Sequence, residues 1–486
     1  MSEVLTREAL RMTPTEAVPL PAHEDGVALM REGLTAFAAR VALARAATRS
    51  LDLQYYAWHG DLTGGLLARE ALRVAERGVR VRLLLDDMYA MGRERMLAAL
   101  DTHPHIEVRL FNATRWRMLG PPGMLLEMLF GGWHLDRRMH NKAWIMDGEA
   151  AILGGRNIGD EYFDASGHFN FRDLDLVVLG RAAADTQAVF EQYWNHRLAR
   201  PLRKVSRAAY RPGGLRRLSA WLDTACAAPE AQPFFQRLGE HPAVASVLSG
   251  EAGSRFIPVG PGAVRVVADP PDKASGKAPG AACLAPAILH ALHGAEREAL
   301  LISPYFVPGR IGTTLLEGLA KRGVRVSVVT NSLAATDVVA VHGGYAKYRE
   351  RLLAAGITIH ELMPTGDEGA SVFGSRGASL HSKALAIDGA LGFVGSFNMD
   401  PRSAALNTEM GAFVRAPNLA AQLREEHDRL CDPARSWRVT REAPGRLAWQ
   451  GAPEGQMLTV HGEPEASILR RVLARITRWL PVEKKL

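Results

Sequence analysis

The feature that most constrains the fold is an internal repeat. The stretch MHNKAWIMDG at residues 139–148 returns as LHSKALAIDG at residues 380–389, and both follow the pattern His-x-Lys-x4-Asp-Gly. The equivalent residues are His140, Lys142 and Asp147 in the first copy and His381, Lys383 and Asp388 in the second. Two copies with matched flanks indicate that a whole structural unit occurs twice.

The surrounding sequence repeats as well. Each half has an apolar, β-rich run, then a helical stretch that ends in Arg-Gly, then a second apolar run. The glycines after the helices, Gly78 and Gly323, lie 245 residues apart (323 − 78), close to the 241 that separate the motif histidines (381 − 140). Glycine is typical just beyond a helix C-terminus. Strand, helix and strand with short connections predict parallel crossover units.

These patterns predict an α/β fold made of two α-β-α sandwich halves, related by a pseudo-twofold axis with the active site between them. The 486 residues suffice for such a pair of halves. The stretch ADPPDKASGKAPGAA at 268–282 is expected to be an exposed loop between the halves. The expected segments are a helical N-terminus (1–45), the first half (46–215), an irregular linker (216–283), the second half (284–440) and a C-terminal extension (441–486).

Each motif reads as one β-hairpin. Residues two apart on a strand point to the same face, so each histidine shares a face with its lysine. Asp-Gly between apolar runs favours a tight turn. The motif aspartates therefore either act in the chemistry or only make the turn. Both return strands end in Gly-x-Asn, at Asn157 and Asn398, ten residues after the aspartate (157 − 147 and 398 − 388).

Histidine, lysine and asparagine together suit chemistry at phosphorus. Lysine supplies positive charge and asparagine an amide donor for phosphate oxygens. Histidine can attack phosphorus or carry a proton near neutral pH. Displacement needs a nucleophile on one side and an acid on the other, which two facing half-sites provide.

The chain resembles the phospholipase D superfamily, whose signature is the duplicated His-x-Lys-x4-Asp. Several stretches are similar to bacterial cardiolipin synthases, particularly the C-type branch. They are GGRNIGDEYF, NFRDLDL, GSFNMDPRSAALNTEMG, VTNSLAATDVVAVHGGYAKYR and, near the C-terminus, WLPVE. The resemblance implies a phospholipase D-like fold for each half.

It also implies a phosphohistidine mechanism without metal or cofactor. By the resemblance, His140 is the nucleophile and His381 the acid and then the base. The family holds each motif histidine with a downstream carboxylate, for which Glu409 and Asp173 are the candidates. Asp175 is the alternative to Asp173, because the first half has five extra residues between its asparagine and its carboxylate (173 − 157 against 409 − 398).

Several further residues keep two interpretations. Arg402 and Ser403 either bind phosphate or hold the loop after Asn398. His168 and His360 have no counterpart in the repeat, which favours a surface or packing role. The sequence contains no His-Glu-x-x-His and no cysteine cluster, so no metal site is expected. Three scattered cysteines favour a reducing compartment.

The resemblance implies a phosphatidyl transferase that makes cardiolipin from phosphatidylglycerol, with phosphatidylethanolamine as donor. The alternatives are a phospholipase D, with water as acceptor, and a nuclease. The net charge of +7 permits either an anionic lipid surface or nucleic acid. No basic tract or aromatic–basic interleaving is present, so nucleic acid is not expected. No partner protein is identified.

Two segments indicate contact with lipid. Residues 115–140 are apolar and basic, and are either lipid-facing or a buried loop. Residues 467–486 have apolar residues at helical spacing with arginines between them, which predicts a basic amphipathic helix on an anionic surface, or else one packed on the body. The N-terminus does not read as a signal peptide, and no run of roughly 20 apolar residues occurs. A peripheral place on the cytoplasmic side of the cell membrane is expected.

Overall fold

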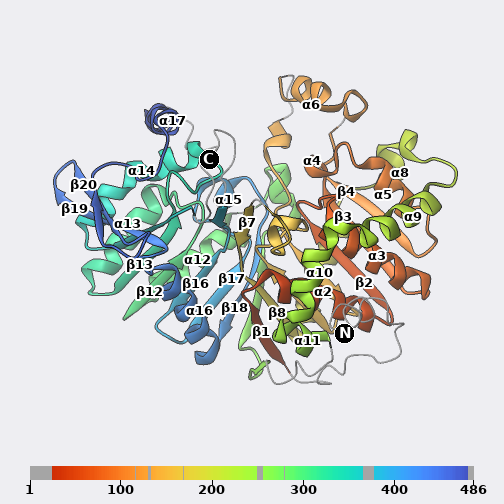
Figure 1. Ribbon diagram of the computed structural model, residues 1–486, viewed down its shortest axis with the longest axis horizontal. Coiled ribbons are helices and arrows are strands. Elements are labelled where there is room, and N and C mark those ends of the chain that lie inside the picture. The colour runs from red at the N-terminus through yellow and green to blue at the C-terminus, as the bar shows by residue number, and fades with distance from the viewer. Residues whose placement is uncertain are drawn as a thin grey trace.

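The computed structural model describes residues 25–114, 116–129, 133–167, 169–248, 256–278, 280–364 and 377–479. The two halves of this part of the chain form two large β-sheets that stand side by side, each with its own helices (Figure 1). The predicted duplicated α/β fold is confirmed.

The first sheet has the order β10 (Ile257–Pro258), β1 (Gly26–Met30), β8 (Asp175–Leu179), β6 (Ala150–Gly154), β5 (Ala143–Met146), β2 (Ser50–Tyr55), β3 (Arg80–Asp86), β4 (Ile106–Phe111) and β9 (Ala199–Pro201). The second has the order β11 (Val264–Ala268), β18 (Met410–Arg415), β17 (Leu391–Gly395), β16 (Ala384–Ile387), β12 (Glu298–Ile302), β13 (Arg325–Asn331), β14 (Thr358–Leu362), β19 (Ser436–Ala443), β20 (Arg446–Gly451) and β21 (Leu458–Val460). The run from β1 to β4 repeats as the run from β11 to β14, so the two halves share one topology.

The strand directions place the two ends of each motif hairpin at opposite edges of the sheet. β2 and β3 are parallel, whereas β5 is antiparallel to β2 with Gln54 opposite Ala143 and Leu51 opposite Met146. The histidine end of the hairpin therefore lies at the carboxyl edge of the parallel strands. The Asp-Gly turn lies at the other edge. Polar groups at the carboxyl edge of parallel strands are the usual place for a site in α/β folds.

Helices cover the outer faces and fill the seam between the sheets. The outer helices of the first half are α2 (Gly33–Ala46), α3 (Leu62–Glu76) and α5 (Glu94–Leu100), and those of the second are α12 (Leu284–His293), α13 (Gly309–Lys321) and α14 (Val339–Ala354). Between the sheets, α7 (Arg181–Trp194) and α16 (Pro417–Leu430) join one buried cluster with residues of both sheets. The two halves thus share a central core.

The region between the halves contains more regular structure than its sequence indicates. It forms α9 (Gly214–Ala227), α10 (Gln232–Glu240) and α11 (Pro242–Leu248), and it adds β10 to the first sheet and β11 to the second. Leu218 and Leu222 of α9 are buried at helical spacing against the first half. α10 buries Phe234, Phe235 and Leu238 and α11 buries Ala243, Val244 and Val247, but each helix has fewer than ten residues, and short helices depend on tertiary packing for their stability.

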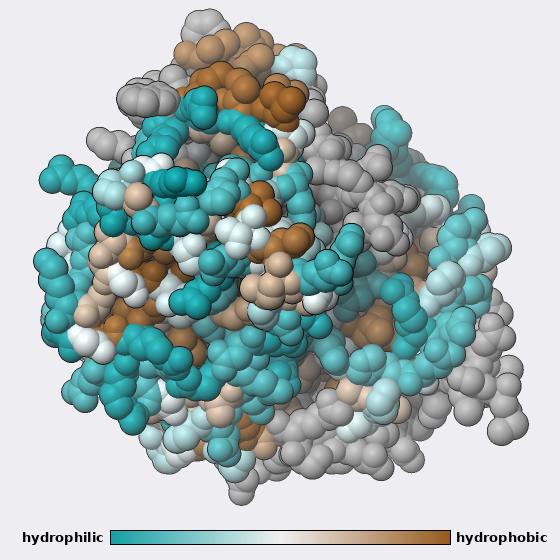
Figure 2. Space-filling view, turned by 60° about the vertical axis from the view of Figure 1, so that its left-hand side comes forward, coloured by the Kyte–Doolittle hydropathy of each residue, from teal (hydrophilic) through white to brown (hydrophobic). Residues whose placement is uncertain are grey.

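Two helices expose apolar residues at the upper side of the molecule in Figure 1. α6 (Gly120–Leu129) projects there, and Leu119, Leu125 and Leu129 are 58%, 59% and 70% exposed. A buried loop is therefore the wrong interpretation for this part of 115–140. Figure 2 shows hydrophobic residues gathered at the top of the molecule, at the height of α6 in Figure 1. No helix in the described ranges is both long enough and apolar enough to cross a bilayer.

The C-terminal helix α17 (Ile468–Trp479) packs on α14 by its polar side. Arg470 is buried and donates to the carbonyls of Leu333 and Thr336, and Gly343 of α14 leaves no room for a Cβ beside Ala474. The apolar stripe faces away from the body, with Ile468, Leu469, Val472, Leu473 and Ile476 exposed. The alternative that this stripe packs on the protein is wrong for these residues. Leu480 lies outside the described residues.

Candidate active site

Each motif histidine lies where a segment of its own half pairs in parallel with a segment of the other half. A parallel bridge joins Met139 to Thr408, so that the His140 amide donates to the Thr408 carbonyl at 2.9 Å. In the other direction, β7 (Phe169–Arg172) pairs in parallel with β15 (Gly377–Leu380), and the His381 amide donates to the Arg172 carbonyl at 2.8 Å. Each motif is therefore bonded to the segment that carries the carboxylate of the opposite half.

The result is a crossed pair of histidine–carboxylate contacts. His140 Nδ1 lies 2.8 Å from Glu409 Oε2, and His381 Nδ1 lies 2.5 Å from Asp173 Oδ2. All four side chains are buried, and both carboxylates have essentially no exposed surface. A carboxylate at Nδ1 favours the tautomer that carries its proton there, which leaves the Nε2 lone pair of each ring free.

Sheet register identifies Asp173 as the counterpart of Glu409. Gly154 lies opposite Asp175 in the first sheet, and the equivalent Gly395 lies opposite Gly411 in the second. Two residues earlier on each strand are Asp173 and Glu409. Asp175 itself is buried and pairs with Arg40 at 2.9 Å, away from either motif histidine. The structure thus brings Asp173, not Asp175, to His381.

Burial favours the neutral form of both imidazoles in the free site. It lowers the pKa of His140 and of His381 well below the usual value, and the ammonium groups of Lys142 and Lys383 lower both further. The pKa of Glu409 is raised to about 7, because burial outweighs the attraction of Lys142. Burial likewise raises the pKa of Asp173. An unprotonated ring with a free Nε2 is the form that attacks phosphorus.

A second layer of polar contacts holds Glu409. Ser396 and Ser403 donate hydroxyl hydrogen bonds to its two oxygens, and its backbone amide donates to Asp269 at 2.8 Å. Asp269 in turn accepts from Lys273 Nζ at 2.7 Å, and both residues are buried. The expectation that 268–282 is an exposed loop is therefore wrong for these two residues. The Asp-x-x-x-Lys spacing was the one available signal, and the proline- and glycine-rich composition obscured it.

Aromatic rings pack against both motif histidines. Tyr56 meets His140 edge-on with ring centroids 5.1 Å apart, and Phe171 and Tyr162 lie 4.8 and 5.4 Å from His381. Isolated aromatic residues at strand ends carry no sequence signal that separates site from core. Their apolar faces limit the water around each ring, which strengthens the electrostatic interactions inside the site.

Similarity to known proteins identifies the family to which this site belongs. Residues 41–194 and 288–431 match the family model described as cardiolipin synthase, PLD-like domain. The chain is 37% identical over 469 residues to cardiolipin synthase C of Escherichia coli K12, covering 94% of this chain and 95% of that one. It belongs to this phospholipase D-like family. A cardiolipin synthase of Geobacillus kaustophilus is 26% identical, over 80% of this chain and 62% of that relative.

Fold comparison agrees with the family. The phosphatidylserine synthase of Haemophilus influenzae Rd KW20 superposes with a TM-score of 0.58 at 14% sequence identity, over 99% of this chain and 100% of that one. At this level of identity the likeness concerns the fold. The family model and the 37% identity to cardiolipin synthase C make the protein a phosphatidyl transferase of the phospholipase D type.

Within this phosphatidyl transferase the two motif lysines lie behind the histidines. Lys142 Nζ donates to the His140 carbonyl at 2.7 Å, and Lys383 Nζ donates to the His381 carbonyl. Both are buried, and burial lowers the pKa of Lys142 well below its usual value and that of Lys383 to about 8. Desolvated ammonium groups with few partners are suited to an incoming phosphate anion.

We expect kcat/KM to fall as the pH rises above about 8. The pKa of Lys383 is lowered, so the charged form persists below about 8 and is lost as the pH rises through that value. The phosphate of bound substrate stabilises the charged form of Lys383 and so raises its pKa. The fall in kcat should therefore come at a higher pH than the fall in kcat/KM. Rate profiles from pH 6 to 10 test this. Lys383→Arg, which cannot lose its charge in this range, should alter the alkaline limb and leave the part that comes from Lys142, whose pKa is also lowered; an unchanged limb would assign it to other groups.

The two motif asparagines are not equivalent. Asn157 is fully engaged, since its Oδ1 accepts from the Ala57 amide at 3.2 Å and its Nδ2 donates to the Tyr162 hydroxyl at 2.9 Å. Asn398 Oδ1 is buried without a hydrogen-bond partner among the described residues. Asn398 is therefore the asparagine whose carboxamide remains open to a ligand.

The motif aspartates lie at the turn, away from the histidines. Asp147 and Gly148 have φ angles of 56° and 73°, and Asp388 and Gly389 repeat this with 54° and 66°. The Asp147 carboxylate accepts from the amides of residues 48–50, and Asp388 accepts from those of 296–298. Along an extended strand the turn is roughly 20 Å from the histidine. This placement does not support direct chemistry by either aspartate.

Asp147→Asn should leave kcat within a few-fold of the wild type. Asparagine also tolerates the left-handed conformation and makes the same turn. It accepts fewer of the three amide hydrogen bonds, so the free energy of unfolding should fall by about 1 kcal/mol. Thermal melting and steady-state rates measured on the same preparation check both. A well-folded variant without activity would return the aspartate to the chemistry.

The remaining candidates have structural partners. Arg402 donates to the Asp136 carbonyl at 2.7 Å and, with its positive charge, lowers the pKa of His140. Ser403 holds Glu409. His360 contacts Cys431 Sγ at 3.3 Å, in a packing position, and burial lowers its pKa to about 4. His168 lies outside the described residues.

Two groups in the described part of the chain combine side chains that could hold a metal ion. The first is His59, Asp61 and Glu161, and the second is His342, Glu361 and Glu463. Asp61 caps α3 and accepts the Asp160 amide, and both glutamates of the second group pair with Arg349. These carboxylates already serve structural partners, and neither group includes a motif residue.

Proposed function

We propose that this protein is a cardiolipin synthase, which moves a phosphatidyl group from a donor phospholipid to phosphatidylglycerol through a phosphohistidine. The observation that carries the proposal is the crossed pair of buried histidines, each held at Nδ1 by a carboxylate. The similarity to cardiolipin synthase C of Escherichia coli over 94% of the chain supports the acceptor.

In the first step the Nε2 lone pair of His140 attacks the donor phosphorus. The bond from phosphorus to the headgroup alcohol breaks, and His381 in its protonated form gives that oxygen its Nε2 proton. The 2.8 Å contact between His140 Nδ1 and Glu409 fixes the orientation of the ring, so that Nε2 stays directed toward the phosphorus. Lys142 and Lys383 neutralise the non-bridging oxygens, whose charge grows in the transition state.

In the second step the free hydroxyl of phosphatidylglycerol attacks the same phosphorus. Now neutral, His381 takes the hydroxyl proton at Nε2, the phosphorus–nitrogen bond breaks, and cardiolipin leaves. The bound anionic phosphate raises the pKa of His381 from its depressed value in the free site, so one group serves as acid and then as base. The aromatic walls reduce competition from water as acceptor.

Charges at the rim support a donor with a cationic headgroup, phosphatidylethanolamine. The Glu161 carboxylate, 3.1 Å from His59, is close enough to His381 to act on its pKa. On the other half, Asp337 accepts from the Tyr305 hydroxyl and acts on the pKa of Lys383. Phosphatidylethanolamine carries an ammonium group close to its phosphate. Carboxylates beside tyrosine rings suit that ammonium group, and the neighbouring lysines suit the phosphate.

The test is incubation with labelled phosphatidylglycerol, with and without phosphatidylethanolamine, followed by lipid separation. Cardiolipin formed together with free ethanolamine supports the proposal. Cardiolipin with release of glycerol, at the same rate in both mixtures, would make phosphatidylglycerol the donor. Phosphatidic acid as the sole product would make the protein a phospholipase D. Glu161→Gln should slow the reaction with phosphatidylethanolamine more than the reaction in which phosphatidylglycerol is the donor.

We further propose a peripheral position on the cytoplasmic face of the cell membrane. The exposed stripe of α17 supports it, because Arg471, Arg475 and Arg478 are exposed beside the apolar residues. A helix with an apolar stripe and a basic flank lies in the plane of an anionic bilayer surface.

A triple change in α17, Ile468→Ser, Val472→Ser and Ile476→Ser, should weaken binding to anionic vesicles roughly 100-fold, as measured by sedimentation, since each of three exposed side chains loses about 1 kcal/mol of membrane burial. Activity on detergent-dispersed short-chain lipid should stay unchanged, because the three residues are exposed and make no part of the site. Ile311→Ser, which removes another exposed isoleucine on α13, is the control. Unaltered vesicle binding by the triple variant would contradict the membrane role of α17.

A further inference from the structure

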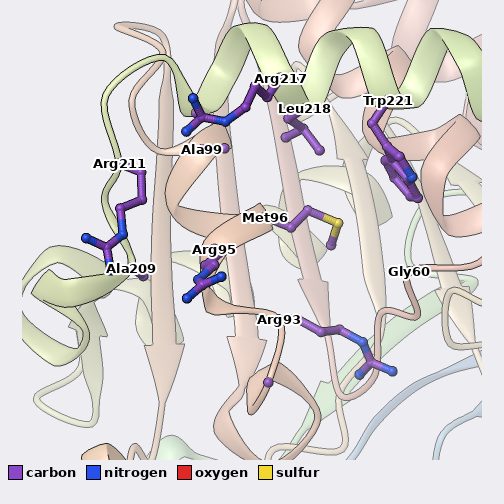
Figure 3. Close-up of a pocket in the computed structure, with 12 residues that line it drawn as sticks. Gly60, Arg93, Arg95, Met96, Ala99, Ala209, Arg211, Arg217, Leu218 and Trp221 are labelled. Carbon is purple, nitrogen blue, oxygen red and sulfur yellow. The ribbon is translucent and has the colours of Figure 1, made fainter.

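A second basic site lies in the first half, outside the motif residues. A cavity of about 570 Å³ opens between α5 and α9, beside Gly60 and Gly92. Figure 3 shows four arginine side chains around it, Arg93, Arg95, Arg211 and Arg217, from both elements and the loops before them. No acidic side chain is among the residues that line it.

The arginine charges are not neutralised within the described structure. Arg95, Arg211 and Arg217 form no ion pair with any described residue. The nearest acidic residues on the same two helices are engaged elsewhere, since Glu94 pairs with Arg117 and Asp223 pairs with Arg69, both at 3.0 Å. The cavity therefore concentrates positive charge in a concave space, which favours an anion.

One wall of the cavity is apolar. Met96, Leu218 and Trp221 line it, and the Trp221 side chain is 45% exposed (Figure 3). Gly60 follows β2 and Gly92 follows β3, so the cavity lies at the same edge of the sheet as the motif histidines. Rings link the two sites, since Tyr56 lies against both His140 and Tyr89, and Tyr89 stacks on His59, next to Gly60.

We propose that this cavity binds the phosphate headgroup of an anionic phospholipid, as a site separate from the one that performs transfer. Guanidinium forks match phosphate oxygens in two-point hydrogen bonds, and the apolar wall fits the glycerol and the first acyl carbons of a lipid. The volume lies within the range of small-molecule sites. A lipid held here keeps the carboxyl edge of the first sheet against an anionic surface.

The test is titration of the whole protein with dihexanoyl phosphatidylglycerol below its micelle concentration, followed by tryptophan fluorescence. Trp221→Phe identifies the part of the signal that comes from the cavity. Arg95→Gln with Arg217→Gln should weaken binding at least tenfold, while turnover of a monomeric short-chain substrate stays unchanged. The matched control is Arg80→Gln with Arg415→Gln, which removes two exposed charges at the opposite edge of the sheets.

Inorganic phosphate and dihexanoyl phosphatidylcholine form the comparison arms. Binding of phosphatidylglycerol at least tenfold tighter than of either supports the proposal. Equal affinity for inorganic phosphate would overturn the lipid assignment in favour of a free-phosphate site. Affinity for phosphatidylglycerol that is the same in the Arg95/Arg217 variant and in the wild type would overturn the cavity as an anion site, provided that both melt at the same temperature.

Discussion

Alanine in place of either His140 or His381 should remove turnover, with a loss on the order of 10⁵-fold or more for each, because nucleophile and acid act as a unit. The two variants should differ in a single-turnover experiment. With a donor whose leaving group needs no protonation, such as a nitrophenyl phosphodiester, His381→Ala should still form the covalent phosphohistidine. His140→Ala should not. Labelling with a radioactive donor, quenched in alkaline denaturant because a phosphohistidine hydrolyses in acid, measures this directly.

The labelling experiment also tests the assignment of roles. Label that persists in His140→Ala and disappears in His381→Ala would exchange nucleophile and acid. Substantial turnover by either variant would contradict the mechanism with two half-sites. The motif aspartate variant Asp147→Asn serves as the folded control, because its change lies at the far edge of the sheet.

Glu409→Gln should lower kcat by about 10³- to 10⁴-fold, by the effect of losing the carboxylate that fixes a catalytic histidine tautomer. An amide can accept the Nδ1 proton or donate to that nitrogen, so His140 is no longer held with its lone pair at Nε2. Folding should change little. The pKa of Glu409 is raised to about 7, so its pocket already accepts a neutral group of the same shape.

The control is Glu70→Gln, since Glu70 is also a buried glutamate but pairs with Arg45 and Arg73 on the outer face of the first half. It should keep full kcat. Because the pKa of Glu409 is raised to about 7, its carboxylate is lost as the pH falls through that value, and the rate of the wild type should fall with it. A full rate for Glu409→Gln would contradict the pairing as what holds the His140 proton at Nδ1.

The repeat made much of this fold predictable. Periodic apolar runs and the glycines at 78 and 323 placed the crossover units, and both glycines have the positive φ angles, 84° and 83°, of helix ends. The Asp-Gly turns defined the hairpins, but their strands begin at Ala143 and Ala384, so the histidines and lysines precede the strands on which the i, i+2 spacing placed them. These features are local, so a single sequence carries them.

Contacts between distant segments were not predictable in the same way. Sequence order offers no reason for His140 to meet Glu409, 269 residues later, and not Asp173 of its own half. Asp269 and Lys273 stand in a stretch whose composition resembles a loop, and only the tertiary structure buries them. The stripe of α17 was visible, but which side faces the body depends on Arg470 and on the space beside Gly343.

The crossed pairing also has a consequence for the chain while it is being made. His140 leaves the ribosome 269 residues before the carboxylate that orients it, and Asp173 waits 208 residues for His381. A nascent or truncated first half can therefore complete neither histidine–carboxylate pair by itself. Activity that needs both pairs is therefore expected only after the second half has folded against the first.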